Sequence, residues 1–294
     1  MIRTGEPHRV SSYDAKKERS PRGRPCQREE IVAMLRAVIF DYPQTHLHRN
    51  EARELFGDLI VFKQRAFERT KRMFVAMDKH DMISTHVLIY DVQNIHGPRL
   101  VLAIRNSYET RTRRYEGLDL PYAAYLDAMG PDGKAALEKF RADVGPLVNC
   151  DMWCVDPEYT FKDSGQRISE LAFFLICLQT LRAGFSHFMG CANERYKASR
   201  WVAPIGTLRQ GVRFQHPTVP GEHRLILLER FDREWLEWCA TSYGGVVART
   251  WDLVPDELGY PSLPATMDQL RAGRLPMDRP PEHSDDTIAR EAAT

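Results

Sequence analysis

The chain has 294 residues, 43% of them hydrophobic, which is enough to bury a full core in one large domain carrying extensions. Its 41 Lys and Arg residues balance 40 Asp and Glu residues, so no overall field draws it to nucleic acid or to an anionic membrane. Six cysteines without disulfide-framework spacing, a start without a signal peptide and no apolar run near the ~20 residues of a membrane span predict a cytoplasmic protein.

The N-terminal half begins with an arm and two helical patterns. Residues 1–28 carry many basic residues and almost no apolar periodicity, which predicts a disordered basic arm. Apolar residues recur at helical spacing from Glu29 until the pattern breaks at Tyr42-Pro43, and again from Asn50 to about Asp78. Next come an antiparallel hairpin of residues 84–92 and 100–107, and a helical insertion over 108–147.

A crossover unit follows the insertion. The pattern predicts a strand over about 148–155, a turn over 156–167, a helix ending near Arg182, and a second strand over 185–192. Two strands joined through a helix in this way run parallel, and the crossover is right-handed. The turn then lies at the carboxyl edge of the sheet, where such folds bind ligands.

The rest of the chain completes one domain over residues 29–252. Proline and charge dominate from Leu253, which predicts a loosely attached C-terminal tail over 253–294. The segments expected before it are a short helix over 194–203, a loop over 204–222, a strand over 223–231 and a helix over 232–243.

The turn of the crossover carries residue types suited to an anion. Backbone amides at the start of a helix bind phosphate, because they have no partner within the helix and lie at its positive end. The residues that would contact a pyrophosphate there are Lys162, Ser164, Gly165, Gln166 and Arg167.

The order of elements around this turn resembles a known superfamily. The text VDPEY at 155–159, Gly165, LAFF at 171–174, Gly184-Phe185 and then Asn193 resemble the Gcn5-related N-acetyltransferase superfamily. The resemblance covers roughly residues 55–235. It implies an α/β (α+β) fold with a mixed central sheet flanked by helices.

The resemblance also implies how an acyl thioester would bind. The family's turn reads R/Q-x-x-G-x-G/A and holds the pyrophosphate of coenzyme A, whereas this chain has Thr160, Asp163 and Gly165 at the three fixed positions. The amide that polarises the thioester carbonyl would come from a splayed strand. Its residues would be Trp153, Cys154 and Val155, with Asn193 on the next strand also near the donor.

A subgroup of the superfamily resembles the chain in further motifs. Asp78-Lys-His-Asp81, Thr85, Tyr90 and Arg105 resemble the D-x-x-D...T stretch of acyl-homoserine-lactone synthases and the arginine of their following strand. Arg105 would contact substrate by this resemblance.

Two further segments bear on that subgroup. The loop 204–222 resembles a segment of the same synthases and of long-chain N-acyl amino acid synthases. The E-x-x-R of the lactone synthases would fall on Asn149 and Met152 here.

Acyl transfer to an amine needs a polarised carbonyl, a neutral amine and a proton acceptor. Carboxylates beside strands and turns also act as helix caps or as surface ion pairs, and that structural role stays open for each candidate. The candidate bases are Asp151, Asp78, Asp81 and Glu158.

Two aromatic residues on the short helix after Asn193 complete the candidate site. Tyr196 can donate a proton to the leaving thiolate, and Trp201 can contact substrate, while core packing accounts equally well for either ring. Cys150 and Cys154 would lie about 13 Å apart on a strand, too far to share a metal ion, so the sequence implies no metal site.

Three functions remain open at this point. The first is an N-acyltransferase that joins an acyl thioester of coenzyme A or acyl carrier protein to a small amine, with no tightly bound cofactor. The insertion 108–147 and the N-terminal helices would form the acyl and acceptor walls. The second is an acyl-homoserine-lactone synthase, and the third is a non-catalytic module of the same fold that binds an acyl carrier or a protein partner.

Overall fold

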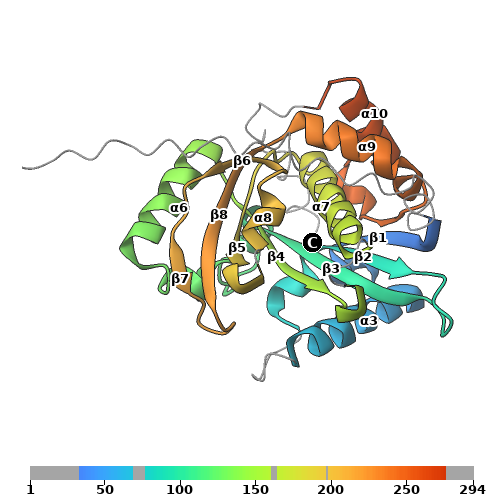
Figure 1. Cartoon of the computed structure of the whole chain (residues 1–294), viewed down its shortest axis with the longest axis horizontal. Helices are drawn as coiled ribbons and strands as arrows, with labels where there is room; N and C mark the ends of the chain where they lie inside the picture. The colour runs from blue at the N-terminus through green and yellow to red at the C-terminus, as the bar shows by residue number, and fades with distance from the viewer. Residues whose placement is uncertain (1–32, 69–76, 160–163, 197, 276–294) are drawn as a thin grey trace, which may run out of the picture.

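The computed structural model describes residues 33–68, 77–159, 164–196 and 198–275 (Figure 1). The predicted arm 1–28, Lys162 and the last part of the predicted tail, 276–294, lie outside the described residues. None of the described helices combines the length and the apolar content that a membrane crossing requires.

The described residues form one mixed sheet with the strand order β6-β8-β5-β4-β3-β2-β1-β9, and β7 also pairs with β8. Neighbouring strands are antiparallel, except that β4 runs parallel to β5 and β1 parallel to β9. The strands are β1 (Leu35–Asp41), β2 (Thr85–Asp91), β3 (Arg99–Tyr108), β4 (Val148–Val155), β5 (Phe188–Asn193), β6 (Gly206–Arg209), β7 (Arg213–Gln215), β8 (Glu222–Phe231) and β9 (Trp251–Leu253).

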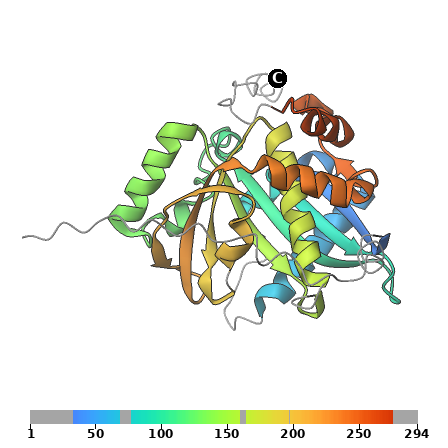
Figure 2. The ribbon, with the colours of Figure 1, turned by 45° about the horizontal axis from the view of Figure 1, so that its top comes forward.

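Helices cover both faces of this sheet (Figures 1 and 2). One face carries α7 (Ser164–Arg182), α9 (Arg233–Val247) and α10 (Leu263–Arg271), and the other carries α3 (Asn50–Glu68) and α6 (Gly130–Val144). The shorter helices are α2 (Pro43–His46), α4 (Glu109–Thr112), α5 (Ala123–Leu126) and α8 (Ala198–Val202), and the 3-10 turns are η1 (Lys79–Met82), η2 (Pro157–Tyr159), η3 (Glu194–Tyr196) and η4 (Asp256–Leu258).

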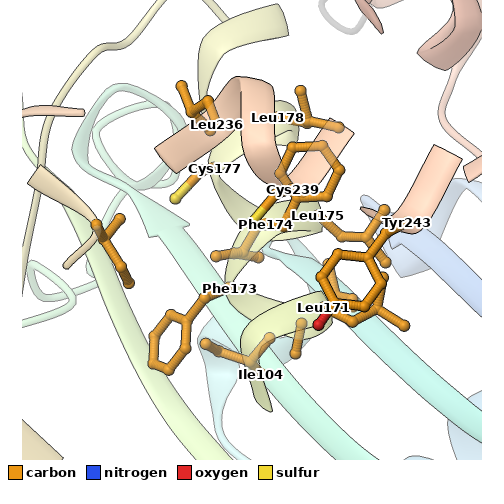
Figure 3. Packing of buried hydrophobic residues seen from close by; sticks show 14 of the residues in the cluster. Ile104, Leu171, Phe173, Phe174, Leu175, Cys177, Leu178, Leu236, Cys239 and Tyr243 are labelled. Atoms are coloured by element: carbon orange, nitrogen blue, oxygen red, sulfur yellow. The ribbon is translucent and has the colours of Figure 1, made fainter. Parts of the chain in front are cut away.

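The core centres on α7, which is buried on nearly all sides. Residues 171–180 of this helix are all buried, because the sheet lies on one side and α9 and α10 on the other. Figure 3 shows side chains of α7, among them Phe174 and Cys177, on the side of Leu236, Cys239 and Tyr243 of α9. A helix that is apolar all round belongs in the middle of such a layered core.

Most of the predicted elements are confirmed. Residues 84–92 and 100–107 form the antiparallel hairpin β2–β3, and 108–147 contains α4, α5 and α6. The crossover β4–α7–β5 is present with its two strands parallel, and Gly184 ends α7 with a φ of 86°.

The helix predicted from Glu29 to the break at Tyr42-Pro43 is wrong from Leu35 onward. Leu35–Asp41 is the strand β1, which lies between β2 and β9 and is buried on both faces. A strand covered on both faces reads as a continuous apolar run, so the period that separates a strand from a helix is absent from its sequence.

Two boundaries in the C-terminal half also differ from the prediction. The loop expected over 204–222 contains β6 and β7, which pair along the outer edge of β8. The tail expected to start at Leu253 is packed as far as Leu275: β9 pairs with β1, and α10 buries Leu263, Met267 and Leu270 in the main core. Pro264, at the second position of α10, is one of the prolines that made this segment read as a tail, but proline is tolerated in the first turn of a helix.

Candidate active site

The strand β4 is irregular at Met152. This residue has a φ of 51°, and the pairing with β3 shifts there: Asp151 lies opposite Arg105, and Cys154 lies opposite Ala103. Two residues of β4 therefore face one residue of β3. A bulge of this kind takes an amide out of the ladder and re-aims it. It adjoins the segment 153–155 that the resemblance marks for holding the thioester carbonyl.

The strands β4 and β5 separate beside this bulge. Their parallel pairing is limited to Asn149 and Met189, although both strands continue toward their carboxyl ends. They pass very close at that point, because a Cβ on Gly190 would overlap the carbonyl oxygen of Cys150. Beyond it, the edge of β4 that faces β5 has no ladder partner in the described residues.

The residues of β5 that lie beyond the pairing with β4 are those after Met189, up to Asn193. His187 precedes β5, and its Nε2 bonds the carbonyl oxygen of Pro146 at 2.9 Å.

Arg105 of β3 gathers three carboxylates next to the bulge. Its Nε and Nη2 donate to the two carboxylate oxygens of Asp151 at 2.7 and 2.8 Å. Its Nη1 donates to Asp78 at 2.7 Å and to Asp81 at 2.8 Å. The side chain of Arg105 is 3% exposed, that of Asp151 17% and that of Asp78 37%, so this cluster reaches solvent through its two outer carboxylates.

The spacing of Asp78 and Asp81 has a local cause. Asp78 caps η1 by accepting from the backbone N–H groups of His80 and Asp81, and the carboxylate of Asp81 accepts from the N–H of Asp78. This reciprocal capping needs two acceptors three residues apart. It holds both carboxylates on the same side of the turn, toward Arg105.

Buried cations fix the charge of Asp81. Burial raises the pKa of this carboxyl, but the positive charges of Arg105 and Lys63 outweigh burial and hold the pKa well below its usual range. Lys63 of α3 donates to both oxygens of Asp81, at 2.8 and 2.7 Å. His86 is fully buried, and burial lowers its pKa to about 4, so this ring is neutral near pH 7.

Asp151 combines burial with directed hydrogen bonds. Burial raises the pKa of this carboxyl, whereas the charge and hydrogen bonds of Arg105 lower it, and the net direction is upward. This direction agrees with the expectation for a carboxyl on a central strand. Asn149 donates from Nδ2 to Asp151 Oδ2 at 2.8 Å, and Tyr125 of α5 donates to Asn149 Oδ1 at 2.7 Å.

Aromatic residues lie next to the bulge on the α7 side of β4. The Trp153 ring lies edge-on to Phe173 at 5.1 Å and to Trp201 at 6.0 Å between ring centroids. The indole Nε1 of Trp153 is buried and has no hydrogen-bond partner among the described residues. Trp201, a predicted substrate contact, therefore lies close to the bulge, and its role stays a prediction.

The remaining candidates are spread around this centre. Glu158 is 70% exposed and pairs with Arg99 at 2.6 Å, about 20 Å along β3 from Arg105 at ~3.3 Å per residue. Asn193 donates to the carbonyl of Pro220 at 3.0 Å and accepts from the N–H of Arg195. Cys154 is buried against α3, and burial raises the pKa of its thiol to about 12.

The remaining predicted site residues lie at the ends of β4 and η3 and in the first turn of α7. Val155 ends β4, and Tyr196 ends η3. The first turn of α7 is formed by Ser164, Gly165, Gln166 and Arg167. The predicted roles of all these residues stay predictions.

Sequence reasoning missed Lys63, Tyr125 and the part played by Asn149. Lys63 carried a signal, because it lies four residues after the buried Leu59 and so falls within the apolar stripe of α3. Nothing local marks Tyr125, since its contact with Asn149 joins residues 24 positions apart. Among the described residues, no group of three or more His, Cys, Asp or Glu side chains could hold a metal ion.

No protein-family model matches this chain, and no curated protein matches it by sequence. Solved structures match it in fold. FeeM, an N-acyl amino acid synthase from uncultured soil microbes, is 12% identical with a TM-score of 0.45 over 68% of this chain and 92% of that chain.

Two other solved structures show the same range of similarity. The CoA-dependent acyl-homoserine lactone synthase MesI is 13% identical, with a TM-score of 0.47 over 73% of this chain and 98% of that chain. An agmatine N-acetyltransferase is 14% identical, with a TM-score of 0.40 over 66% of this chain and 99% of that chain.

Proposed function

We propose that this protein is an N-acyltransferase. It moves an acyl group from a thioester of coenzyme A or acyl carrier protein to the amine of a small molecule such as an amino-acid derivative. The observation that carries the proposal is the bulge of β4 at Met152, which lies where β4 leaves β5 and directly beside Asp151.

The bulge supplies the first requirement of the reaction. Acyl transfer builds negative charge on the carbonyl oxygen, and a backbone N–H aimed at that oxygen stabilises the charge without reorganising. The edge of β4 that faces β5 offers such groups, because its ladder stops after Asn149. A thioester arm between the two strands would bring its carbonyl to this edge.

Asp151 would supply the proton acceptor that the reaction requires. The amine nitrogen attacks the carbonyl carbon, a C–N bond forms, and the C–S bond breaks to release the thiolate. The proton lost by the amine passes to Asp151, and the thiolate takes a proton from Tyr196 or from water. A carboxyl whose pKa is raised by burial is a better proton acceptor than an exposed one.

The acceptor would approach from the face that carries α3 and α6. Asp151 and Asn149 lie toward this face, since Asn149 contacts α5 and the Arg105 cluster contacts α3. The insertion 108–147 and α3 would then form walls of the acceptor site. The aromatic residues Trp153, Phe173 and Trp201 lie toward the α7 face and would contact the acyl donor.

A panel of donors and acceptors tests this proposal. The full chain is incubated with short, medium and long acyl thioesters of coenzyme A and of acyl carrier protein, each with a set of amino-acid amines. Thiol release and the mass of the product are measured. We expect release with at least one pair, and no release with any pair would overturn the proposal.

Asp151→Asn should lower kcat about 100-fold, because general-base catalysis is worth at least that factor. Asp127→Asn is the matched control, since Asp127 is an exposed aspartate that pairs with Lys134. Its kcat should stay at the wild-type value. A fully active Asp151→Asn enzyme would contradict the role of Asp151.

One observation supports a second candidate, an acyl-homoserine-lactone synthase. Asp78 and Asp81 both accept from Arg105, and all three are among the residues named by that resemblance. This candidate requires S-adenosylmethionine as the acceptor and a lactone as the product. The same panel includes that acceptor, and absence of any lactone excludes this candidate. Tight carrier binding with the thioester intact would instead favour the non-catalytic module.

A further inference from the structure

Tyr125 is held rigidly at the border between the helical insertion and the outer strands. Its ring is 5% exposed and stacks on Phe214 of β7, with centroids 6.0 Å apart at 24°. The His216 ring, just beyond the end of β7, lies 5.6 Å away. These contacts leave the phenol little freedom, so the direction of its hydroxyl is set by packing.

The hydroxyl of Tyr125 determines the orientation of the Asn149 amide. Burial raises the pKa of this phenol well above its usual value, so the group keeps its proton and donates. It donates to Asn149 at 2.7 Å, and only the Oδ1 side of an amide accepts. The amide nitrogen of Asn149 is therefore turned the other way, toward Asp151.

The turned amide reaches Asp151 through a short contact. Nδ2 of Asn149 donates to Oδ2 of Asp151 at 2.8 Å, and a longer contact of 3.5 Å reaches the carbonyl of Pro121. A flipped amide would place its oxygen against the carboxylate, which repels it. Because Tyr125 and Pro121 both belong to the insertion 108–147, this insertion controls which atom of Asn149 meets Asp151.

We propose that Tyr125 is a positioning residue for Asp151, acting through the side chain of Asn149. This inference rests on the proposed function, in which Asp151 receives the proton of the amine. By this inference the helical insertion 108–147 orients the proton acceptor Asp151, in addition to forming a wall of the acceptor site.

Several groups besides Asn149 influence the titration of Asp151, and the test must separate their effects from that of Asn149. Charged and titratable groups face this carboxyl from β3, η1, α3, α5, β4 and β5. They are Arg105, Asp78, His80, Asp81, Lys63, Tyr125, Cys150, Cys154 and Cys191. Arg105 remains in every variant below, so any change reports the contact from Asn149.

The first measurement is a carboxyl titration by ¹³C NMR on the full chain, which does not depend on activity. Tyr125→Phe removes only the hydroxyl and keeps the stacked ring. Losing a donor to the charged form raises the pKa of a carboxyl, so we expect the midpoint of the Asp151 titration to rise by about 0.5 pH units or more. Tyr122→Phe is the control, because Tyr122 is also buried and donates to Glu109 instead.

The second measurement is a double-mutant cycle with Asn149→Leu. Two residues that act through one another give effects that do not add. Tyr125→Phe should therefore shift the titration in the wild-type background and have no further effect beside Asn149→Leu. Asn149→Ala replaces Asn149→Leu if that variant does not fold.

The pH profile of acyl transfer gives the corresponding kinetic readout. The acidic limb of kcat/KM should move by the same amount as the Asp151 titration in Tyr125→Phe, while KM for the donor stays unchanged. An unchanged titration in Tyr125→Phe, or an equal shift beside Asn149→Leu, would overturn the inference. A wild-type protein without acyl transfer would overturn the proposed function alone, because the titration and the cycle would still be decided.

Discussion

The buried guanidinium of Arg105 is matched by charged hydrogen-bond partners on its donors. Five of the contacting groups carry charge: three carboxylates, Arg105 and Lys63. Taking such charges out of water is costly, and the cost is offset only when every donor and acceptor is matched. The cluster meets this condition with contacts of 2.7 to 2.8 Å, so its geometry is fixed before any substrate arrives.

The buried ring of His86 gives this cluster a dependence on pH. Its Nε2 donates to the backbone carbonyl of Asp81 at 2.9 Å, and burial lowers the pKa of the ring from 6.5 to about 4. Below pH 6.5 the unfolded chain binds a proton at this histidine that the folded chain does not. The stability it contributes is therefore complete above pH 6.5 and is lost as the pH falls toward 4.

We expect this loss to reach about 3 kcal/mol, because a pKa that differs by one between the folded and unfolded chains corresponds to about 1.4 kcal/mol. Urea unfolding between pH 7 and pH 4 measures it. His86→Gln keeps an N–H donor and removes the titration, so the slope with pH should become shallower. His96→Gln, at an exposed histidine, should keep the wild-type slope. Equal slopes for both variants would contradict the assignment.

At the scale of elements, the pairing of β4 with β5 depends on Gly190. The close approach of the two strands leaves no space for a Cβ at this position. A substitution must push the strands apart at the point where they still pair, and the opening beyond that point would change with it. The glycine thus connects the packing of the sheet to the shape of the candidate site.

Gly190→Ala should destabilise the protein by about 2 kcal/mol, which is typical of forced overpacking in a core. At a temperature where the variant is fully folded, kcat should still be lower than in the wild-type protein, so that unfolding cannot account for the loss. Gly57→Ala is the control: Gly57 lies on α3 with open space around it, and replacing a helical glycine stabilises by about 0.5–1 kcal/mol. The unfolding midpoint and kcat for acyl transfer are measured for both variants. A Gly190→Ala variant with wild-type stability and kcat would contradict the role of Gly190.

The elements also show where sequence reasoning succeeds. The hairpin β2–β3 could be predicted because Gly97-Pro98 interrupts two runs of β-forming residues, and α7 because its apolar residues persist for more than two turns. β1 could not, since burial on both faces removes the alternation that marks a strand.

The candidate site divides along similar lines. Asp78, Asp81 and Arg105 could be named from a resemblance to known motifs. The bulge could not, because Met152 adopts a positive φ without the glycine that signals such positions. The chain of contacts from Tyr125 to Asp151 joins the insertion to β4, and no single stretch of sequence encodes it.

At the scale of the whole molecule, the segment after Leu253 belongs to the main core. α10 packs against α9 and α7, and Leu270 is fully buried. Thr266 is also fully buried, and its hydroxyl donates to the carbonyl of Ser262 at 3.0 Å. The layers of the sheet, α7, α9 and α10 therefore share one continuous apolar interior.

Leu270→Ala should lower the free energy of unfolding by about 3 kcal/mol, as for other buried leucines. The unfolding transition should stay a single step, because α10 shares its core with α7. Leu208→Ala is the control at a leucine that is 36% exposed, and its effect should be within about 0.5 kcal/mol. A separate early transition in Leu270→Ala would indicate that α10 forms an independent unit.

The short strands at the two edges of the sheet affect how the protein behaves at high concentration. In the described part of the chain, the sheet ends on β9 at one border, with three residues, and on β6 and β7 at the other, with four and three residues. An approaching polypeptide would find only a few unpaired backbone groups at either border. Short edge strands of this kind offer few backbone groups for pairing with a strand of another molecule. We therefore expect the sheet to resist aggregation by edge-to-edge strand pairing.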